Sequence, residues 1–275
     1  MILWAEGEFR TPETTRVPWN DRGLLLGHGV FATMRGYRGT CFRAREHVEM
    51  LAFGARSLGI ATPRSVDEIV AIANEAAHRT SCEDAYVRVT LTAGPLDGPA
   101  TLLIQASNFD DIPTEETYAR GVTTAILEAR RSGPTCIDPR IKTTSYAAEV
   151  FARREARTRG LFEGLQRSAV DGSIACATMS NVFVVKNGTV RTPALACGCR
   201  NGLTRRTLLE LARDEGHTVD EGTITEADLY EADEIFLAST RIEALPVGIV
   251  GAHAIPIGPV AAKLRRALRK LAGVV

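Results

Sequence analysis

The sequence predicts a mixed α/β fold in two domains. Patterns typical of strands and of amphipathic helices alternate along the chain. With 275 residues, 45% of them hydrophobic, the chain is long enough for one large core or two modest ones. The acidic, proline-containing and aperiodic segment Asn108–Glu116 has the composition of a linker. We therefore expect a small N-terminal domain over residues 1–109, a linker over 110–117 and a larger C-terminal domain over 118–275.

The elements before the linker follow from apolar spacing and from helix-end signals. Ser65, with Glu68 three residues later, forms a capping box that marks the start of a helix. Gly59 ends the helical apolar spacing of the segment before it. Glycines in the run Asp21–Phe31 indicate tight turns close to a group that needs room. The predicted elements are a hairpin over residues 2–10 that turns at Glu6-Gly7, helices over 46–58 and 66–78, and strands over 86–92 and 101–105.

The elements after the linker include one strong local signal. Asn187-Gly188 between two apolar runs is the strongest short-range indication of a hairpin. The final segment is a basic amphipathic helix, and we expect its charges to form a solvated face. The predicted elements are a strand over 122–127, a basic loop over 130–140, a helix over 147–157, a hairpin over 181–190, a helix over 202–215, a strand over 234–240 and a helix over 260–271.

Charge and hydropathy exclude several classes of partner. The 33 Lys and Arg residues balance 33 Asp and Glu residues, so neither nucleic acid nor a membrane surface is expected as the main partner. No apolar stretch reaches the roughly 20 residues of a membrane helix. The segment from Met1 to Glu6 lacks the basic and apolar parts of a secretory signal. We therefore expect a cytoplasmic protein.

The six cysteines predict free thiols. They lie at positions 41, 82, 136, 176, 197 and 199, without the spacing of a disulfide framework. Cys197-Gly198-Cys199 is the only close pair, and a metal site would need two further ligands that the sequence does not offer at suitable spacing. We therefore interpret the pair as part of a loop and predict no metal site.

Three separate features can carry chemistry, although standard nucleophile, zinc and Walker motifs are absent. Lys142 lies at a loop-to-helix junction, where burial can lower the pKa of an amine. The helix start Gly202-Leu203-Thr204 offers amides that attract a phosphate, and Ser239-Thr240 places hydroxyls at a strand end. Taken alone, each feature is more often a surface charge, a capped helix or a plain turn. Together they suggest a phosphorylated aldehyde held as a Schiff base.

Six sequence pieces occur in the order of a known family. They are Asp21-Arg22-Gly23 with Gly27-His28-Gly29-Val30-Phe31, Glu46-His47, Ile141-Lys142-Thr143-Thr144, Ser180-Asn181-Val182-Phe183, Gly202-Leu203-Thr204-Arg205, and Ser239-Thr240 followed by Pro246-Val247. On these pieces the whole chain resembles the class IV aminotransferases, the pyridoxal-phosphate enzymes of fold type IV. That family includes branched-chain and D-amino acid aminotransferases and aminodeoxychorismate lyase. The resemblance implies a small N-terminal α/β domain, a larger C-terminal mixed α/β domain, a cofactor in the cleft between them, and a homodimer.

The resemblance also assigns roles to individual residues. Lys142 matches the lysine that forms the Schiff base with pyridoxal 5'-phosphate and then moves the substrate proton. The implied cofactor-binding residues are Leu203 and Thr204 at the phosphate, Ser239 and Thr240 in a second hydroxyl-bearing turn, Tyr146 at the phenolic oxygen and Cys176 at the pyridine nitrogen. The implied substrate pocket contains Phe31, Arg88 and Cys197.

Two departures from the family pattern bear on the cofactor. Cys176 stands where the family has a glutamate that keeps the pyridine nitrogen protonated. A protonated thiol is an uncharged, weak donor, so we expect slow transamination. Met50 stands where the family has an arginine that pairs with the phosphate. Loss of that contact is expected to weaken cofactor binding by about 2 to 4 kcal/mol, or ~30- to 1000-fold.

Three functions stay open at this point. The first is an enzyme that acts on an amino acid, a keto acid or an aminodeoxychorismate-like small molecule through a Lys142 Schiff base with pyridoxal phosphate. The second is a cofactor-free enzyme that uses Lys142 as a base or as an amine for a carbonyl substrate. The third is a non-catalytic binding homologue. Leu91 stands where D-amino acid enzymes carry a carboxylate-binding arginine, which disfavours that substrate class.

Overall fold

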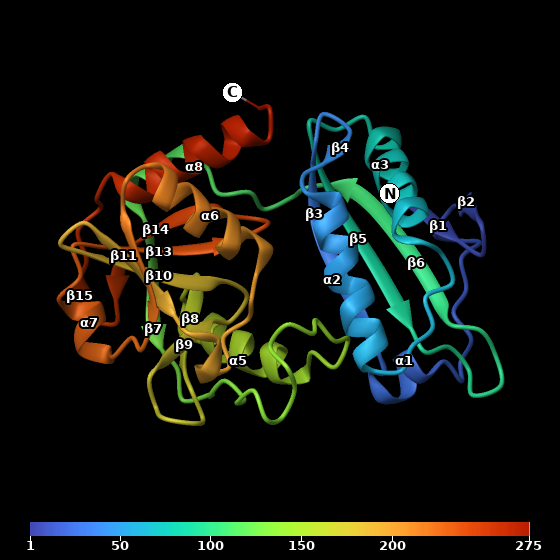
Figure 1. Cartoon of the computed structure of the whole chain (residues 1–275), viewed down its shortest axis with the longest axis horizontal. Coiled ribbons are helices and arrows are strands. Elements are labelled where there is room, and N and C mark those ends of the chain that lie inside the picture. Colours follow the sequence, from blue (N-terminus) through green and yellow to red (C-terminus); the bar gives the residue numbers. More distant parts are fainter. Residues whose placement is uncertain (275) are drawn as a thin grey trace. The chain divides into compact units, whose positions relative to one another are not determined.

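The computed structural model describes residues 1–274, which form two compact units (Figure 1). The first contains Met1–Asp111 together with Arg140–Tyr146, and the second contains Ile112–Pro139 together with the chain from Ala147 onward. Each unit has its own sheet, helices and apolar core. The predicted boundaries at residues 109, 110–117 and 118 stay a prediction. The return of residues 140–146 to the first unit is a feature that the sequence does not predict.

The first unit is built on a six-stranded sheet in the order β2-β1-β6-β5-β3-β4. Its pairs are antiparallel, and β3 lies along β5 from Gly29 opposite Thr92 to Tyr37 opposite Asp84. The predicted hairpin and the two predicted strands before the linker are confirmed. The strands are β1 (Ile2–Ala5), β2 (Glu8–Arg10), β3 (Gly29–Tyr37), β4 (Thr40–Cys41), β5 (Asp84–Thr92) and β6 (Thr101–Asn108).

Two helices, α2 (Ala44–Ser57) and α3 (Val66–Arg79), pack on this sheet, and a short helix, α1 (Arg22–Leu26), precedes β3. The predicted capping box is confirmed, because the Ser65 hydroxyl accepts from the Glu68 amide and the Glu68 carboxylate accepts from the Ser65 amide. Buried residues at helical spacing on α2 and α3 join buried residues of β3, β5 and β6 in one core. The two helices and the sheet of the first unit therefore share one core.

The second unit is built, within residues 112–274, on a nine-stranded mixed sheet. Its main path is β12-β11-β10-β13-β14-β7-β8-β9, and β15 pairs with β14. The strands are β7 (Val122–Ile126), β8 (Glu163–Arg167), β9 (Ile174–Ala177), β10 (Asn181–Lys186), β11 (Thr189–Pro193), β12 (Thr218–Gly222), β13 (Glu234–Ser239), β14 (Glu243–Val250) and β15 (His253–Ala254). The helices are α4 (Glu115–Arg120), α5 (Ala147–Thr158), α6 (Leu203–Asp214), α7 (Glu226–Tyr230) and α8 (Val260–Leu271), with a short 3-10 helix, η1 (Leu195–Cys197).

The central strands of this sheet are buried on both faces. Val182 and Val184 of β10 belong to one apolar core, whereas Phe183, between them, belongs to another with residues of α6 and α8. Phe183 also stacks on Phe236 of β13 at 4.7 Å between ring centroids. The predicted turn at Asn187-Gly188 is confirmed, with both residues in the left-handed conformation that a tight hairpin requires.

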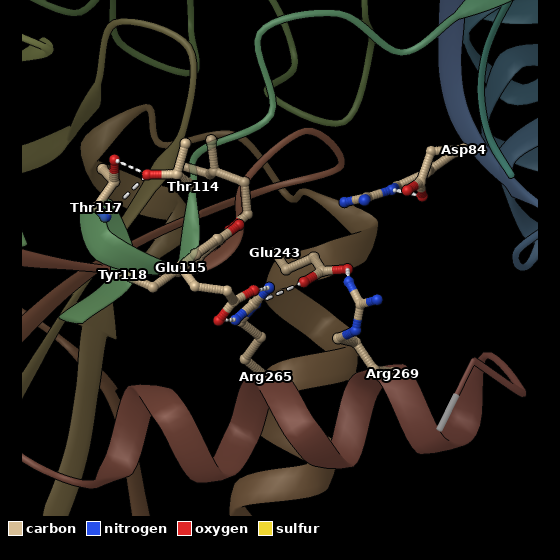
Figure 2. Close-up of polar contacts among 10 residues, drawn as sticks. Asp84, Thr114, Glu115, Thr117, Tyr118, Glu243, Arg265 and Arg269 are labelled. Atoms are coloured by element: carbon tan, nitrogen blue, oxygen red, sulfur yellow. Dashed lines mark hydrogen bonds and ion pairs between the residues drawn. The ribbon is translucent and has the colours of Figure 1, made fainter.

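The predicted solvated face of α8 is wrong in part. Lys263, Arg266 and Lys270 are exposed, but the side chains of Arg265 and Arg269 are only 14% and 23% exposed. Both guanidinium groups bind the buried carboxylate of Glu243 (Figure 2). The basic charge of this helix therefore has an internal partner that helical periodicity does not reveal.

Two further expectations can be compared with the described residues. The six cysteines are free thiols, as predicted. In the part of the chain that the structure describes, helices are too short or too polar to cross a membrane.

Candidate active site

The segment that carries Lys142 pairs with the beginning of β3. The Phe31 amide donates to the Lys142 carbonyl at 2.8 Å, and the Thr144 amide donates to the Gly29 carbonyl at 2.9 Å. An antiparallel bridge joins Val30 to Thr143. These bonds fix the main chain of Lys142 against the sheet of the first unit, although both sequence neighbours of the segment belong to the second unit.

Gly27 and Gly29 permit this close approach. Gly27 has a φ of 65°, which favours glycine, and a Cβ atom there would collide with Ser145. A Cβ atom at Gly29 would press on Thr144. The hydroxyls of Thr144 and Ser145 donate to the Gly27 carbonyl at 2.8 and 3.1 Å. The sequence prediction that these glycines make room for another group is confirmed, and the group is the lysine segment.

Four predicted site residues meet at the ring of Phe31. The Lys142 Nζ lies 4.6 Å from the ring centroid, and the Arg88 guanidinium carbon lies 3.6 Å from it. Tyr146 meets the same ring edge to face at 5.3 Å between centroids. Arg88 also donates to the Thr90 hydroxyl at 3.0 Å, which supports β5. The ring therefore positions two cations and a phenol in one cluster.

Asp21 supports the segment that leads to this cluster, and in the sequence it stands out only as part of a motif. Its carboxylate is fully buried and accepts from the Gly23 amide at 2.7 Å. It also accepts from the hydroxyls of Thr92 at 2.9 Å and Thr101 at 2.6 Å. These bonds tie α1 to the ends of β5 and β6, and so fix the chain that leads to Gly27 and Gly29.

In the second unit, the start of α6 offers unpaired amides. Gly202 is the N-cap residue, and its position supplies no side-chain cap. Within residues 1–274, the amides of Leu203 and Thr204 have no hydrogen-bond acceptor, as expected for the first turn of an uncapped helix. A helix start of this kind attracts an anion through its amides and its dipole.

Asn181 brings this helix start and the end of β13 to one edge of the sheet. Its side-chain amide donates to the Arg200 carbonyl at 2.7 Å, and a Cβ atom at Gly202 would collide with its side-chain oxygen. Asn181 also lies opposite Ala238, which directly precedes Ser239 and Thr240. The two predicted anion-binding segments, Leu203-Thr204 and Ser239-Thr240, therefore lie on either side of one asparagine.

Glu163 fixes the tight turn that leads into Asn181. The carboxylate is 2% exposed, and it accepts from the Met179 amide at 2.8 Å and from the Ser180 hydroxyl at 2.7 Å. The Thr178 hydroxyl lies 3.3 Å from it. Sequence reasoning did not single out Glu163, because its partners become visible only when β8 and β9 are paired.

Three cysteines gather beside this turn. Cys176, Cys197 and Cys199 form a buried cluster with Ala175. The thiols of Cys197 and Cys199 lie against the carbonyl oxygens of Ala194 and Pro193 at 2.8 and 3.2 Å. The predicted loop is confirmed at Gly198 and Cys199, whereas Cys197 is the last residue of η1. Within residues 1–274, no group of three or more His, Cys, Asp or Glu side chains could hold a metal ion.

Two thiols of this cluster differ in acidity. Burial raises the pKa of the Cys176 thiol to about 11, so this side chain is uncharged at neutral pH. Hydrogen bonds from the Cys199 side chain and backbone lower the pKa of the Cys197 thiol below its usual range, although burial opposes this. Cys176 also contacts Gln166 on the neighbouring strand, with 3.9 Å between sulfur and oxygen. The position predicted to face a pyridine nitrogen is therefore neutral.

Each unit carries residues that suit one part of a phosphorylated aldehyde such as pyridoxal phosphate. The unpaired amides of Leu203 and Thr204 and the adjacent hydroxyl-bearing turn suit a phosphate. Lys142, held beside Phe31 and Tyr146, suits an aldehyde. The first group of residues belongs to the second unit and the second group to the first unit.

Two mixed α/β units with these residue clusters define an enzyme of the fold type IV class. A family model described as "Amino-transferase class IV" matches residues 29–250, and the chain belongs to that family. A branched-chain-amino-acid aminotransferase of Pseudomonas aeruginosa is 29% identical over 97% of this chain and 91% of its own length.

Solved structures agree with this assignment. The crystal structure of the Escherichia coli branched-chain amino acid aminotransferase has a TM-score of 0.93 and 26% identity, and the match covers 100% of this chain and 95% of that one. Another branched-chain amino acid aminotransferase, solved with pyridoxamine 5'-phosphate, has a TM-score of 0.92 and 26% identity over the same shares of the two chains.

The low pKa of Cys197 leads to a testable pH dependence. The thiol becomes a thiolate as the pH rises through its lowered pKa, so the ultraviolet thiolate absorbance of the native protein should show a step below the usual pH range of a cysteine. Cys197→Ser should abolish this step. Cys136→Ser, which removes an exposed thiol, should keep it. A step that persists in Cys197→Ser would assign the ionisation to another residue.

Proposed function

We propose that this chain is a pyridoxal-phosphate-dependent aminotransferase that forms a Schiff base at Lys142 and acts on an apolar, branched-chain type of amino acid. The observation that carries this proposal is the attachment of the Lys142 segment to β3 beside Phe31, Arg88 and Tyr146. The substrate class comes from the relatives, which are branched-chain amino acid aminotransferases. The amine of Lys142 suits an aldehyde, and the amides of Leu203 and Thr204 suit a phosphate.

Each residue then has a defined task. Bound pyridoxal phosphate supplies an aldehyde and an electron-withdrawing ring. The Lys142 amine binds the aldehyde and, once released by the incoming amino group, moves the proton of the substrate carbon. The amides of Leu203 and Thr204 and the hydroxyls of Ser239 and Thr240 bind the phosphate. Tyr146 donates to the phenolic oxygen, and Arg88 binds the substrate carboxylate.

The neutral thiol at Cys176 sets the expected speed of the reaction. A carboxylate would keep the ring nitrogen protonated and strengthen electron withdrawal, whereas an uncharged thiol with a pKa of about 11 does not. We therefore propose slow turnover, with the proton transfer at Lys142 as the step that limits the rate.

We also propose a homodimer. An apolar patch consisting of Trp19, Leu24, Leu25, Leu26 and Leu96 is 58% to 79% exposed. Arg22 joins its two parts, because its amide and its guanidinium donate to the Gly94 carbonyl, each at 3.0 Å. An exposed apolar group of this size is typical of a surface that a second copy covers.

The Schiff base can be tested directly. Purified protein with added pyridoxal phosphate should develop a visible absorbance band, and borohydride should fix the cofactor on Lys142, as peptide mass spectrometry would show. Lys142→Ala should lose both the band and the activity. Lys186→Ala is the matched control, because this exposed lysine lies on β10 and binds Asp233 and the Glu231 carbonyl. Activity without any band would favour the cofactor-free enzyme.

The role of Cys176 can be tested by replacing the thiol with a carboxylate and, separately, with an uncharged amide of the same length. Cys176→Glu should raise the turnover number by about 10- to 100-fold, because a charge-assisted hydrogen bond is worth about 1.5 to 3 kcal/mol. Cys176→Gln has the same length without the charge and should leave turnover near the native value. Equal effects of the two substitutions on turnover would contradict a role for charge at this position.

The dimer can be tested by light scattering. Leu25→Asp places a charge in the apolar patch and should shift the protein from dimer to monomer. Leu271→Asp, at an exposed leucine at the end of α8, should leave the assembly unchanged. A native protein that is already monomeric would show that the patch has another role.

A further inference from the structure

The turn that carries Thr240 is held in a strained conformation. β13 ends at Ser239, which lies opposite Glu243 at the start of β14. Glu243 has a φ of 52°, in the left-handed region that residues other than glycine seldom adopt. Such a conformation persists only when surrounding contacts enforce it.

Tyr118 binds the main chain of this turn. The Tyr118 hydroxyl donates to the Ile242 carbonyl at 3.0 Å, and the tyrosine is 8% exposed. Tyr118 lies on α4, whose start is capped by the Thr114 hydroxyl, which accepts from the Thr117 amide. The capped helix therefore presents a phenol to the carbonyl that directly precedes the strained residue.

Two arginines of α8 bind the side chain of the same residue. The carboxylate of Glu243 is 1% exposed; it accepts from Arg265 Nε at 2.9 Å and from Arg269 Nη1 at 3.2 Å (Figure 2). A buried carboxylate that loses its cationic partners is strongly destabilising, so the bonds to the two arginines oppose any displacement of the turn.

Arg265 joins the two supports into one network. Its other nitrogens donate to both oxygens of Glu115 at 3.0 and 2.7 Å. Its guanidinium carbon lies 3.6 Å from the centroid of the Tyr118 ring. Figure 2 shows Glu115 and Glu243 on two sides of Arg265. One guanidinium thus sets the position of Tyr118, Glu115 and Glu243 together.

We propose that Tyr118, Glu243 and the two arginines that bind it, Arg265 and Arg269, are positioning residues that hold the Ser239-Thr240 turn in the shape that binds the phosphate of the cofactor. This inference rests on the proposed function. None of these residues needs to contact the phosphate. They act through the main chain between Thr240 and Glu243, which follows the strand end that pairs with Asn181, the residue against which the start of α6 packs.

A purely structural network would behave differently. If these residues only attached α4 and α8 to the sheet, their substitution would lower the stability of the protein and weaken the binding of all ligands alike. A positioning role instead predicts that substitution reduces the preference for a ligand that carries a phosphate over one that does not. Pyridoxal, which lacks the phosphate but keeps the aldehyde and the ring, separates the two cases.

The test compares the dissociation constants of pyridoxal phosphate and pyridoxal, measured by absorbance titration of the full chain. Tyr118→Phe keeps the ring beneath Arg265 and removes the hydroxyl that donates to the Ile242 carbonyl. It should raise the dissociation constant of pyridoxal phosphate by about three- to tenfold, which corresponds to the loss of one hydrogen bond. The dissociation constant of pyridoxal should stay unchanged. Arg269→Gln removes the more exposed arginine and should have the same selective effect.

Tyr230→Phe is the matched control, because this exposed tyrosine donates to Glu226 Oε1 on α7, at 2.6 Å. It should leave both constants unchanged. Native protein that binds the two ligands equally would overturn the proposed phosphate site itself. A second outcome would contradict the positioning role alone. In that outcome the native protein binds pyridoxal phosphate more tightly than pyridoxal, and Tyr118→Phe and Arg269→Gln either keep this difference or raise both dissociation constants by the same factor.

Discussion

The pairing of residues 142–144 with the beginning of β3 is the interaction on which the candidate site depends. Lys142 lies between two segments of the second unit in the sequence, so the neighbouring sequence does not explain why it pairs with the sheet of the first unit. Main-chain bonds to Gly29 and Phe31 supply that reason, and they form only because Gly27 and Gly29 carry no side chain that would collide with residues 144–145. The position of the amine is therefore determined by absent side chains as much as by Lys142 itself.

Buried carboxylates have a comparable task in the second unit. Glu163 accepts hydrogen bonds from the turn before β10, and Glu243, in the turn after β13, accepts from Arg265 of α8. Glu234 accepts from the amides of Val260 and Ala261 at 2.9 and 2.6 Å and so caps α8. Each acid binds donors that fix a loop or a helix end, which is how a buried charge is accommodated without loss of stability. Two of them, Glu163 and Glu243, border the edge where Leu203-Thr204 and Ser239-Thr240 meet.

Local signals in the sequence predicted most of the elements, whereas long-range partners could not be predicted. The capping box at Ser65 and the turn at Asn187-Gly188 depend on residues within one turn of chain, and both are confirmed. Asp21 depends on a threonine 80 residues away, and Arg265 depends on a glutamate 150 residues away. Helical periodicity therefore assigned Arg265 to solvent. The motifs contain the candidate site residues, and they also contain Asp21 and Asn181 without indicating what these two bind. Glu163 and Glu243 lie outside every motif.

The neutral thiol of Cys176 lies among groups that are themselves neutral or already paired. Its neighbour across the strand pair is the neutral Gln166, and the nearby Arg131 already pairs with Glu149 at 2.5 Å. A carboxylate at this buried position would lack an unpaired cation, so it would ionise readily only against a protonated ring nitrogen. Under the proposed function, a neutral thiol and a neutral amide would favour a ring nitrogen that stays unprotonated. Proton transfer would then depend on the amine of Lys142 in the first unit, and cofactor affinity on the amides and hydroxyls of Leu203-Thr204 and Ser239-Thr240 in the second.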